Sequence, residues 1–289
     1  MIPSRAWAAF AVAWICQVPS FHTETRLVVL HVTVRNAHGE VVTNLDRGAF
    51  AVYENGTPQP ITVFGRDDIP VSVGLLIDNS GSMRSIRGTV EAAALTFANA
   101  SNPDDELFVM NFADKPELDV PFTSDRAKLR RGIARLDAVG GTALRDAIHE
   151  AERYMREHAT RDRRVLVVVT DGNDNESSVS LDAVTLTAQQ RDIVVYAIGL
   201  FGHVEHAKAA RAALNQLSER SGGQAYYPDG IERVDAVAVD IAQQIRNQYT
   251  LGYTPINQAL DGTYRAIQVR VSARERLYPT TRAGYRAVP

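Results

Sequence analysis

The sequence predicts an α/β fold with a doubly wound, mostly parallel sheet, accompanied by N- and C-terminal β segments. Between residues 70 and 248, short apolar runs rich in Val and Ile alternate with longer amphipathic stretches, a pattern typical of repeated βαβ units. Two of the apolar runs end directly in polar segments that contain an Asp. Residues 24–66 and 249–289 instead alternate apolar and polar side chains, as strands with one buried face do.

Residues 1–20 differ from the rest of the chain. Residues 1–5 carry one positive charge, and the following eleven residues, 6–16, are uncharged and mostly apolar. That length suits the core of a signal peptide and is too short for a free membrane-spanning helix. We therefore expect export with cleavage near residue 20, which leaves a mature chain without cysteine or disulfides. The alternatives are an uncleaved segment that anchors the protein, or a buried N-terminal helix.

The segment at residues 24–66 reads as strands joined by turns. Residues 26–35 alternate as a strand, residues 41–42 restart one, and Glu54-Asn55-Gly56 is a hairpin signal that predicts pairing of residues 50–53 with 61–64. The segment at residues 249–289 predicts strands at 249–253 and 264–271. Because each segment is too short to hold a core alone, we expect both to join in one β sandwich, with the α/β domain inserted between them. The alternative is that each packs separately on the α/β domain.

The predicted α/β domain spans residues 70–248. Its expected strands cover residues 71–77, 106–112, 165–169, 193–199 and 225–227. Its expected helices cover residues 84–100, 125–136, 143–157, 181–191, 206–221 and 234–247.

Polar side chains follow two of these strands. Asp78, Ser80 and Ser82 come directly after the strand at 71–77, and Asp171 follows the strand at 165–169. Thr142 adds a hydroxyl from the turn Gly140-Gly141, just before a helix. Ligands of open α/β sheets bind where the strands deliver their carboxyl ends. Carboxylates and hydroxyls are hard oxygen donors suited to Mg²⁺, Ca²⁺ or Mn²⁺ rather than zinc, so the sequence predicts a metal site.

These residues resemble the pattern of the von Willebrand factor type A domain family, which is D-x-S-x-S, then a distant Thr, then a distant Asp. The pattern is complete here as Asp78, Ser80, Ser82, Thr142 and Asp171. In that family these residues form the metal-ion-dependent adhesion site, which normally holds Mg²⁺. The resemblance implies that the two serines bind the ion directly and that the threonine binds directly or through water. It also implies that the two aspartates act through waters.

Two outer segments, residues 48–56 and 246–253, resemble runs found in bacterial exported proteins that carry a related type A domain. These outer runs imply no biochemical activity of their own. The adhesion-site resemblance, and a sequence with no evident general base beyond the coordinating carboxylates, favour a non-catalytic adhesion or scaffold module over an enzyme. Neutral hydroxyl ligands leave much of the charge of Mg²⁺ (or Mn²⁺ or Ca²⁺) uncompensated, so the ion would accept an Asp or Glu carboxylate from a protein partner. A divalent-metal-dependent hydrolase and a purely structural metal site are the alternatives.

Several function classes find no support in the sequence. The net charge of −3, without a basic tract, argues against a nucleic-acid binder. The chain contains neither a Walker A sequence nor a G-x-S-x-G elbow, which disfavours a nucleotidase or an esterase. His203, Glu205 and His206 match neither zinc-protease pattern. Beyond residue 20, no run approaches the length of a membrane span.

Overall fold

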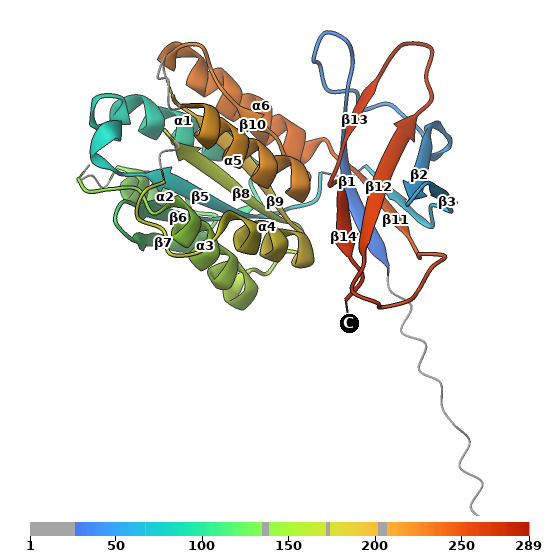
Figure 1. Ribbon diagram of the computed structural model, residues 1–289. Coiled ribbons are helices and arrows are strands. Elements are labelled where there is room, and N and C mark those ends of the chain that lie inside the picture. Colours follow the sequence, from blue (N-terminus) through green and yellow to red (C-terminus); the bar gives the residue numbers. More distant parts are fainter. Residues whose placement is uncertain (1–26, 67, 135–138, 172–173, 202–206, 289) are drawn as a thin grey trace, which may run out of the picture.

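A six-stranded sheet forms the centre of the larger lobe in the computed structural model (Figure 1), which describes residues 27–66, 68–134, 139–171, 174–201 and 207–288. The strand order is β10-β9-β8-β5-β6-β7. All neighbours are parallel except β6 and β7. The strands are β5 (Ser72–Asp78), β6 (Glu106–Phe112), β7 (Pro116–Thr123), β8 (Arg164–Thr170), β9 (Ile193–Gly199) and β10 (Ala225–Tyr226).

Helices cover both faces of this sheet, which confirms the predicted doubly wound architecture. The helices are α1 (Arg87–Ala100), α2 (Arg126–Ile133), α3 (Leu144–His158), α4 (Leu181–Gln190), α5 (Ala207–Ser221) and α6 (Val234–Arg246). Buried residues of α1, α2 and α6 pack on one face, and those of α3, α4 and α5 pack on the other. Neighbouring residues of β5 alternate between the two cores, with Leu75 and Ile77 in the first and Leu76 in the second. This alternation is what a strand buried on both faces requires.

The smaller lobe is a β sandwich built from both ends of the described chain (Figure 1). One antiparallel sheet has the order β13-β1-β11-β4, with β1 (Val28–Arg35), β4 (Val63–Gly65), β11 (Tyr249–Tyr253) and β13 (Tyr278–Thr280). The other has the order β14-β12-β2-β3, with β2 (Phe50–Glu54), β3 (Thr57–Gln59), β12 (Tyr264–Val271) and β14 (Gly284–Arg286). The two sheets share one apolar core, so the two flanking segments do join in one sandwich.

The predicted hairpin turn is correct, but its predicted partner strand is wrong. Asn55 and Gly56 have φ angles of 48° and 79°, the left-handed values that a tight hairpin turn requires. The turn is followed at once by β3, which pairs with β2. Residues 63–65 instead cross to the other sheet and pair with β11. A turn signal predicts only local backbone geometry. The pairing of Phe64 with Leu251 depends on a strand far away in the sequence, which the turn signal does not predict.

Other differences concern edge strands and the ends of elements. The strand β7 was not predicted, because it is an exposed edge strand whose Pro116 and Pro121 weaken a strand signal. The short edge strands β13 and β14 were not predicted either. Residues 41–42 form only an isolated bridge, between Val41 and Arg35, rather than a strand. The helix expected from residue 84 begins at Arg87 after a 3₁₀ turn at Gly81–Ser85.

Buried polar contacts join the two lobes. Arg163, just before β8, donates to the carbonyl of Ile245 at 2.8 Å and to Oε1 of Gln248 at 2.5 Å. The amide of Gln248 in turn donates to Thr33 of β1 at 3.2 Å and to the hydroxyl of Tyr196 at 3.0 Å. These hydrogen bonds connect the end of α6 to both the central sheet and the sandwich. The chain then passes directly from α6 into β11.

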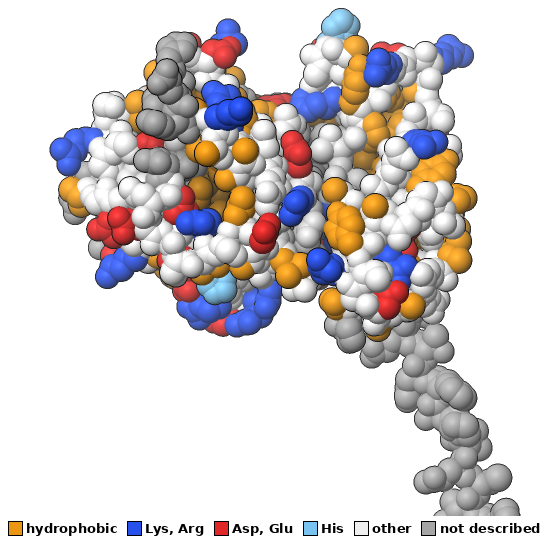
Figure 2. All heavy atoms as spheres, in the orientation of Figure 1, with side chains coloured by type: hydrophobic (Ala, Val, Ile, Leu, Met, Phe, Trp, Pro, Cys, Tyr) orange, Lys and Arg blue, Asp and Glu red, His pale blue; other side chains and the backbone are white. Residues whose placement is uncertain are grey.

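On the face seen in Figure 2, acidic and basic side chains are interspersed over both lobes. Among the described residues, no helix combines the length and the apolar character that crossing a membrane demands.

The middle of β5 leaves no room for a side chain at Gly74. A Cβ atom there would lie 2.4 Å from Cζ of Phe108 and 2.6 Å from Cδ2 of Leu166. We expect Gly74→Ala to lower the free energy of unfolding by about 1–3 kcal/mol, because overpacked cores must shift. Urea unfolding measures this change.

The matched control is Gly88→Ala in α1, where a Cβ atom would meet nothing within 4 Å. Replacing a helical glycine with alanine should raise stability by about 0.5–1 kcal/mol. Equal effects of the two substitutions would contradict the packing of β5 described above.

Candidate metal centre

The strand order brings the two predicted aspartates to the same edge of the sheet. Strands β5 and β8 are parallel neighbours, with Ile77 paired to Val169. The chain leaves β5 for β6 on one side, while β8 lies on the other, so this edge is a switch point of the topology. Ligands of open α/β sheets bind at such points.

Asp78 organises the loop after β5. Its side chain is buried, its Oδ1 accepts the backbone N–H of Ser80 at 2.8 Å, and its Oδ2 accepts the hydroxyl of Thr170 at 2.6 Å. The hydroxyl oxygens of Ser80 and Ser82 lie 3.0 Å apart. Asp78 therefore contacts Ser80, whose hydroxyl in turn lies beside that of Ser82.

Thr142 reaches the same place through a backbone contact between two loops. The N–H of Gly81 donates to the carbonyl of Gly140 at 3.2 Å, which joins the loop after β5 to the turn before α3. The N–H of Ala143 donates to the carbonyl of Ala113, just after β6, at 2.7 Å. Thr142 itself is buried between these contacts.

Asp171 follows the last residue of β8 and completes the set. Its Oδ1 is buried and has no hydrogen-bond partner within the described residues. Its charge also acts on Asp78, since it helps to raise the pKa of that carboxyl. A buried carboxylate oxygen without a donor is costly, and a cation would compensate for it.

Burial raises the pKa of Asp78 to about 6. The hydrogen bonds from Ser80 and Thr170 work in the opposite direction, because they favour the charged form. The ordinary pKa of an aspartate is 3.8, so this carboxyl is held in an environment that disfavours its charge. A metal ion would reverse that balance, since nearby positive charge favours the carboxylate.

The donor set fits a hard divalent cation. It offers two carboxylates and three hydroxyls from three loops, all oxygen donors of the kind that Mg²⁺ accepts together with water. Within the described part of the chain, His, Cys, Asp and Glu side chains form no group of three or more that could hold a metal. The alternative zinc residues His203, Glu205 and His206 lie outside the described residues.

Three polar residues near the site were not singled out from the sequence. Thr170 donates to Asp78, Asn175 accepts from the N–H of Thr142 at 2.8 Å, and Asp114 accepts from the N–H of Gly141 at 2.5 Å. Only Thr170 has a local signal, as the residue between a buried strand and Asp171.

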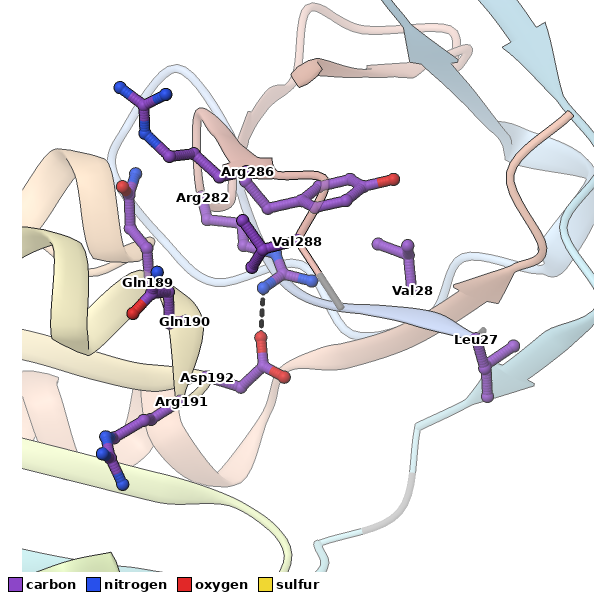
Figure 3. A pocket seen from close by; sticks show the side chains of 10 residues that line it. Leu27, Val28, Gln189, Gln190, Arg191, Asp192, Arg282, Arg286 and Val288 are labelled. Carbon is purple, nitrogen blue, oxygen red and sulfur yellow. Dashed lines mark hydrogen bonds and ion pairs between the residues drawn. The ribbon is translucent and has the colours of Figure 1, made fainter. Parts of the chain in front are cut away.

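A cavity of about 360 Å³ lies far from this edge, at the junction of the two lobes (Figure 3). It is lined by residues of β1, the end of α4 and the region of β14, and Arg282 forms an ion pair with Asp192 across it. The guanidinium of Arg282 also donates to the carbonyl of Val29 at 2.9 Å. The cavity is therefore a crevice between the lobes, separate from the metal centre.

Comparison with known proteins identifies the larger lobe. Residues 73–173, which include Asp78, Thr142 and Asp171, match the family model described as von Willebrand factor type A domain. This chain carries a von Willebrand factor type A (VWA) domain. A comparison with curated proteins finds no match.

Solved structures with this fold come from several organisms. A von Willebrand factor type A protein from Catenulispora acidiphila aligns with a TM-score of 0.55 at 12% identity, over 93% of this chain and 75% of its own. Proximal thread matrix protein 1 from the mussel byssus aligns with a TM-score of 0.54 at 16% identity, over 67% of this chain. The match spans only 51% of the mussel protein. An aerotolerance-related membrane protein from Bacteroides fragilis aligns at 19% identity with a TM-score of 0.51, over 61% of this chain and 98% of its own.

The mussel protein has also been solved with zinc occupying its MIDAS motif, the metal-ion-dependent adhesion site. That structure aligns with this chain at 16% identity and a TM-score of 0.52, over 66% of this chain and 49% of its own. At these identities the likeness concerns the fold.

Proposed function

We propose that this protein is a non-catalytic binding module that captures a partner's Asp or Glu carboxylate through a divalent cation, normally Mg²⁺. The observation that carries the proposal is the buried Oδ1 of Asp171, which has no hydrogen-bond partner among the described residues and lies near the Asp78 carboxylate, at an edge that also carries hydroxyl groups. The VWA domain, a typical protein-interaction module, supports it, as does the zinc-occupied motif of the mussel protein. The proposed ligand set is Asp78, Ser80, Ser82, Thr142 and Asp171.

Each residue has a role that follows from its contacts. The hydroxyls of Ser80 and Ser82 are adjacent and would contact the ion, while Asp78 orients the loop that carries them. A bound ion supplies a positive charge that attracts an anionic oxygen. Burial around Asp78 excludes water and strengthens that attraction.

We also propose where the protein acts and how its chain is divided. We propose export from a bacterial cell, with residues 1–20 as the leader; these residues lie outside the described part of the chain. An aerotolerance-related membrane protein and a type V pilus tip protein, Mfa5 from Porphyromonas gingivalis, share the fold, which supports an exported role. We propose the domain division 24–66, 70–248 and 249–289, with the outer two segments forming one sandwich.

Isothermal titration of the full chain with Mg²⁺ and Mn²⁺ tests the metal site. Saturable binding that a chelator reverses supports the proposal. Metal binding without any affinity for carboxylate ligands would indicate a structural ion instead. Metal-dependent hydrolysis of an ester or a phosphoester would favour the hydrolase alternative.

Thr142→Ala should weaken carboxylate capture more than it weakens metal binding. The hydroxyl is one of the proposed ligands of a charged ion, so we expect Mn²⁺ affinity to fall by about 10-fold or more. Affinity for a carboxylate peptide should fall further, by about 100-fold. The probe is a short synthetic peptide with a single Asp, titrated in saturating Mn²⁺.

The matched control is Thr187→Ala, which removes an exposed hydroxyl on α4 that donates to the carbonyl of Ala183. It should leave both affinities unchanged. Equal losses of metal and peptide affinity in Thr142→Ala would remove the proposed role of Thr142 in ligand capture.

A further inference from the structure

Thr142 is held in place through its main chain by the loop that follows β8. The N–H of Thr142 donates to Oδ1 of Asn175 at 2.8 Å. The carbonyl of Thr142 accepts the N–H of Asn175 at 3.0 Å and that of Glu176 at 3.2 Å. Asn175 therefore bonds Thr142 reciprocally, with a side-chain acceptor on one side and a backbone donor on the other.

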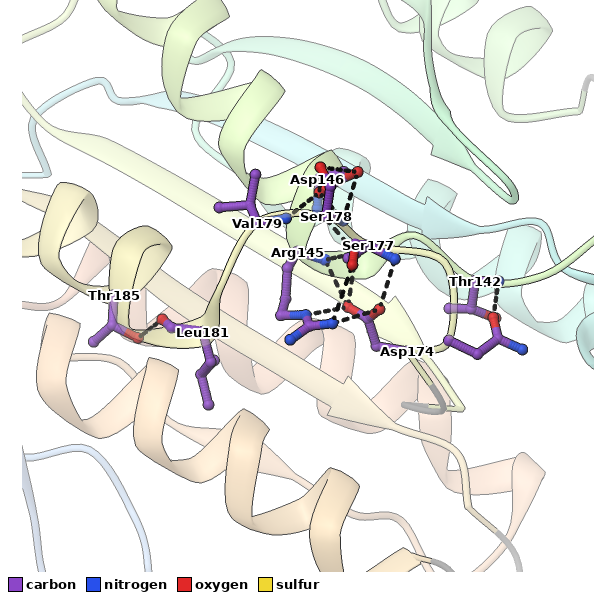
Figure 4. Close-up of polar contacts among 10 residues, drawn as sticks. Thr142, Arg145, Asp146, Asp174, Ser177, Ser178, Val179, Leu181 and Thr185 are labelled. Carbon is purple, nitrogen blue, oxygen red and sulfur yellow. Dashed lines mark hydrogen bonds and ion pairs between the residues drawn. The ribbon is translucent and has the colours of Figure 1, made fainter.

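The same loop caps the start of α3 (Figure 4). Oδ2 of Asp174 accepts both the backbone N–H and the Nε of Arg145, each at 2.9 Å. Oγ of Ser177 accepts the N–H of Arg145 at 3.0 Å and that of Asp146 at 3.2 Å. These acceptors satisfy N–H groups that the first turn of a helix leaves without partners.

The capping is mutual. The carboxylate of Asp146, in the first turn of α3, accepts the N–H of Ser178 at 3.0 Å and that of Val179 at 2.9 Å (Figure 4). Two segments about 30 residues apart are thus joined by bonds in both directions. One of them leads from Asp171, and the other carries Thr142.

We infer that Asn175 is a positioning residue of the metal centre: its side-chain oxygen fixes the backbone of Thr142 and so directs the Thr142 hydroxyl. This inference rests on the proposed function. The residue acts through Thr142 and has no need to touch the ion. Among the bonds that join the two segments, the contact from Asn175 Oδ1 is the one that reaches the N–H of Thr142.

Removing the Asn175 side chain should loosen Thr142 without separating the loop after β8 from the start of α3. In Asn175→Ala, the buried N–H of Thr142 loses its acceptor, while the bonds from Asp174, Ser177 and Asp146 remain. Metal affinity of the folded protein should therefore fall, together with a modest drop in the unfolding midpoint from the unpaired N–H. A merely structural role would lower the midpoint but leave the affinity of the folded fraction unchanged.

The experiment compares Mn²⁺ titrations of the full chain, Asn175→Ala and Asn175→Asp. Loss of residues that orient metal ligands typically weakens affinity about 10-fold or more, and we expect that loss in Asn175→Ala. Asn175→Asp keeps an oxygen acceptor for the N–H of Thr142 and adds a negative charge. Its Mn²⁺ affinity should therefore equal or exceed that of the parent chain.

The matched control is Asn257→Ala. Oδ1 of Asn257 also accepts a backbone N–H, that of Ala259 at 3.1 Å, but in an exposed loop of the sandwich. This variant should bind Mn²⁺ as the parent chain does.

Amide hydrogen exchange at Thr142, measured without metal, gives a second readout. Exchange should be faster in Asn175→Ala and unchanged in Asn175→Asp. This comparison tests the bond to the N–H of Thr142 independently of the ion, and Asn175→Asp keeps it informative if the alanine variant does not fold.

The outcomes separate the two proposals. Parent-like Mn²⁺ affinity in Asn175→Ala, or an equal loss in Asn175→Asp, overturns the positioning role and leaves the metal centre intact. Failure of the parent chain itself to bind Mn²⁺ or Mg²⁺ overturns the proposed function and this inference with it.

Discussion

Asp78→Ala should abolish saturable Mn²⁺ binding while leaving the far-UV circular dichroism nearly unchanged. The substitution removes one of the two carboxylates at the site. It also removes the acceptor of the Ser80 N–H at 2.8 Å and that of the Thr170 hydroxyl at 2.6 Å. Without these bonds the loop that presents Ser80 loses its fixed direction. We expect at least about 100-fold weaker binding, which corresponds to about 2.7 kcal/mol.

The fold should survive this change, because the removed group is a buried carboxyl whose charge the site disfavours in the absence of metal. Global unfolding of Asp78→Ala would show that Asp78 is mainly structural. Titration by calorimetry and a far-UV spectrum of the same sample separate the two results.

Asp261→Ala is the matched control for this experiment. Oδ1 of Asp261 accepts the N–H of Thr263 at 3.0 Å, two residues further along the chain, as Oδ1 of Asp78 accepts that of Ser80. The control thus removes the same local hydrogen bond from an exposed turn of the sandwich. Unchanged Mn²⁺ affinity in this variant ties the loss in Asp78→Ala to the metal centre.

The second large effect concerns Glu152, a carboxyl group buried in α3. The side chain is 1% exposed, and neither of its oxygens has a hydrogen-bond partner among the described residues. Burial raises the pKa of Glu152 to about 9, and Arg191 opposes this shift only in part. The folded protein therefore keeps Glu152 protonated at neutral pH, whereas the unfolded chain ionises it near its ordinary pKa of 4.5.

This difference makes stability depend on pH. Below the unfolded-state pKa of 4.5 both states are protonated, so the contribution of Glu152 to stability is fully present. Between that value and about 9 the folded state binds the extra proton, so stability falls as pH rises, by up to about 1.4 kcal/mol per pH unit. Above the folded-state pKa the contribution is lost.

Glu152→Gln should therefore stabilise the protein at alkaline pH and have little effect at acidic pH. Glutamine is uncharged at every pH, so it mimics the protonated side chain. We expect a gain on the order of 3 kcal/mol at pH 8 and near zero at pH 4. Urea unfolding of both proteins across this range measures the difference.

The control on the same helix is Glu157→Gln. Glu157 is exposed and pairs with Arg153 at 3.2 Å and with Arg156 at 2.8 Å. Exposed ion pairs contribute little to stability because water and salt screen them, so this variant should follow the pH profile of the parent chain. Parallel profiles for Glu152→Gln and the parent chain would mean that Glu152 is charged in the folded state.

Sequence patterns predicted most strands of the central sheet and the positions of the candidate metal ligands. Apolar runs of the right length predicted β5, β6, β8 and β9, because strands buried on both faces need continuous apolar side chains. The same runs predicted where Asp78 and Asp171 would emerge. The spacing of Asp78, Ser80 and Ser82 predicted a metal site, and its ligand roles remain predictions that the titrations test.

Pairing between distant segments could not be predicted with the same success. The hairpin signal at Asn55 gave the turn, yet the strand at Val63–Gly65 pairs with β11, nearly 190 residues away. Strand pairing depends on which faces meet in the sandwich core. That core is built from residues near both ends of the chain, so no local pattern predicts the pairing.

The sequence by itself therefore determined the alternating strands and helices and the oxygen donors at the strand ends, since both follow from local periodicity. Only the tertiary structure decided that Thr170 donates to Asp78, that Asn175 bonds Thr142 and that Glu152 is buried with no hydrogen-bond partner among the described residues. Each of these depends on contacts between segments far apart in the chain, where a hydrogen bond or its absence is set by packing.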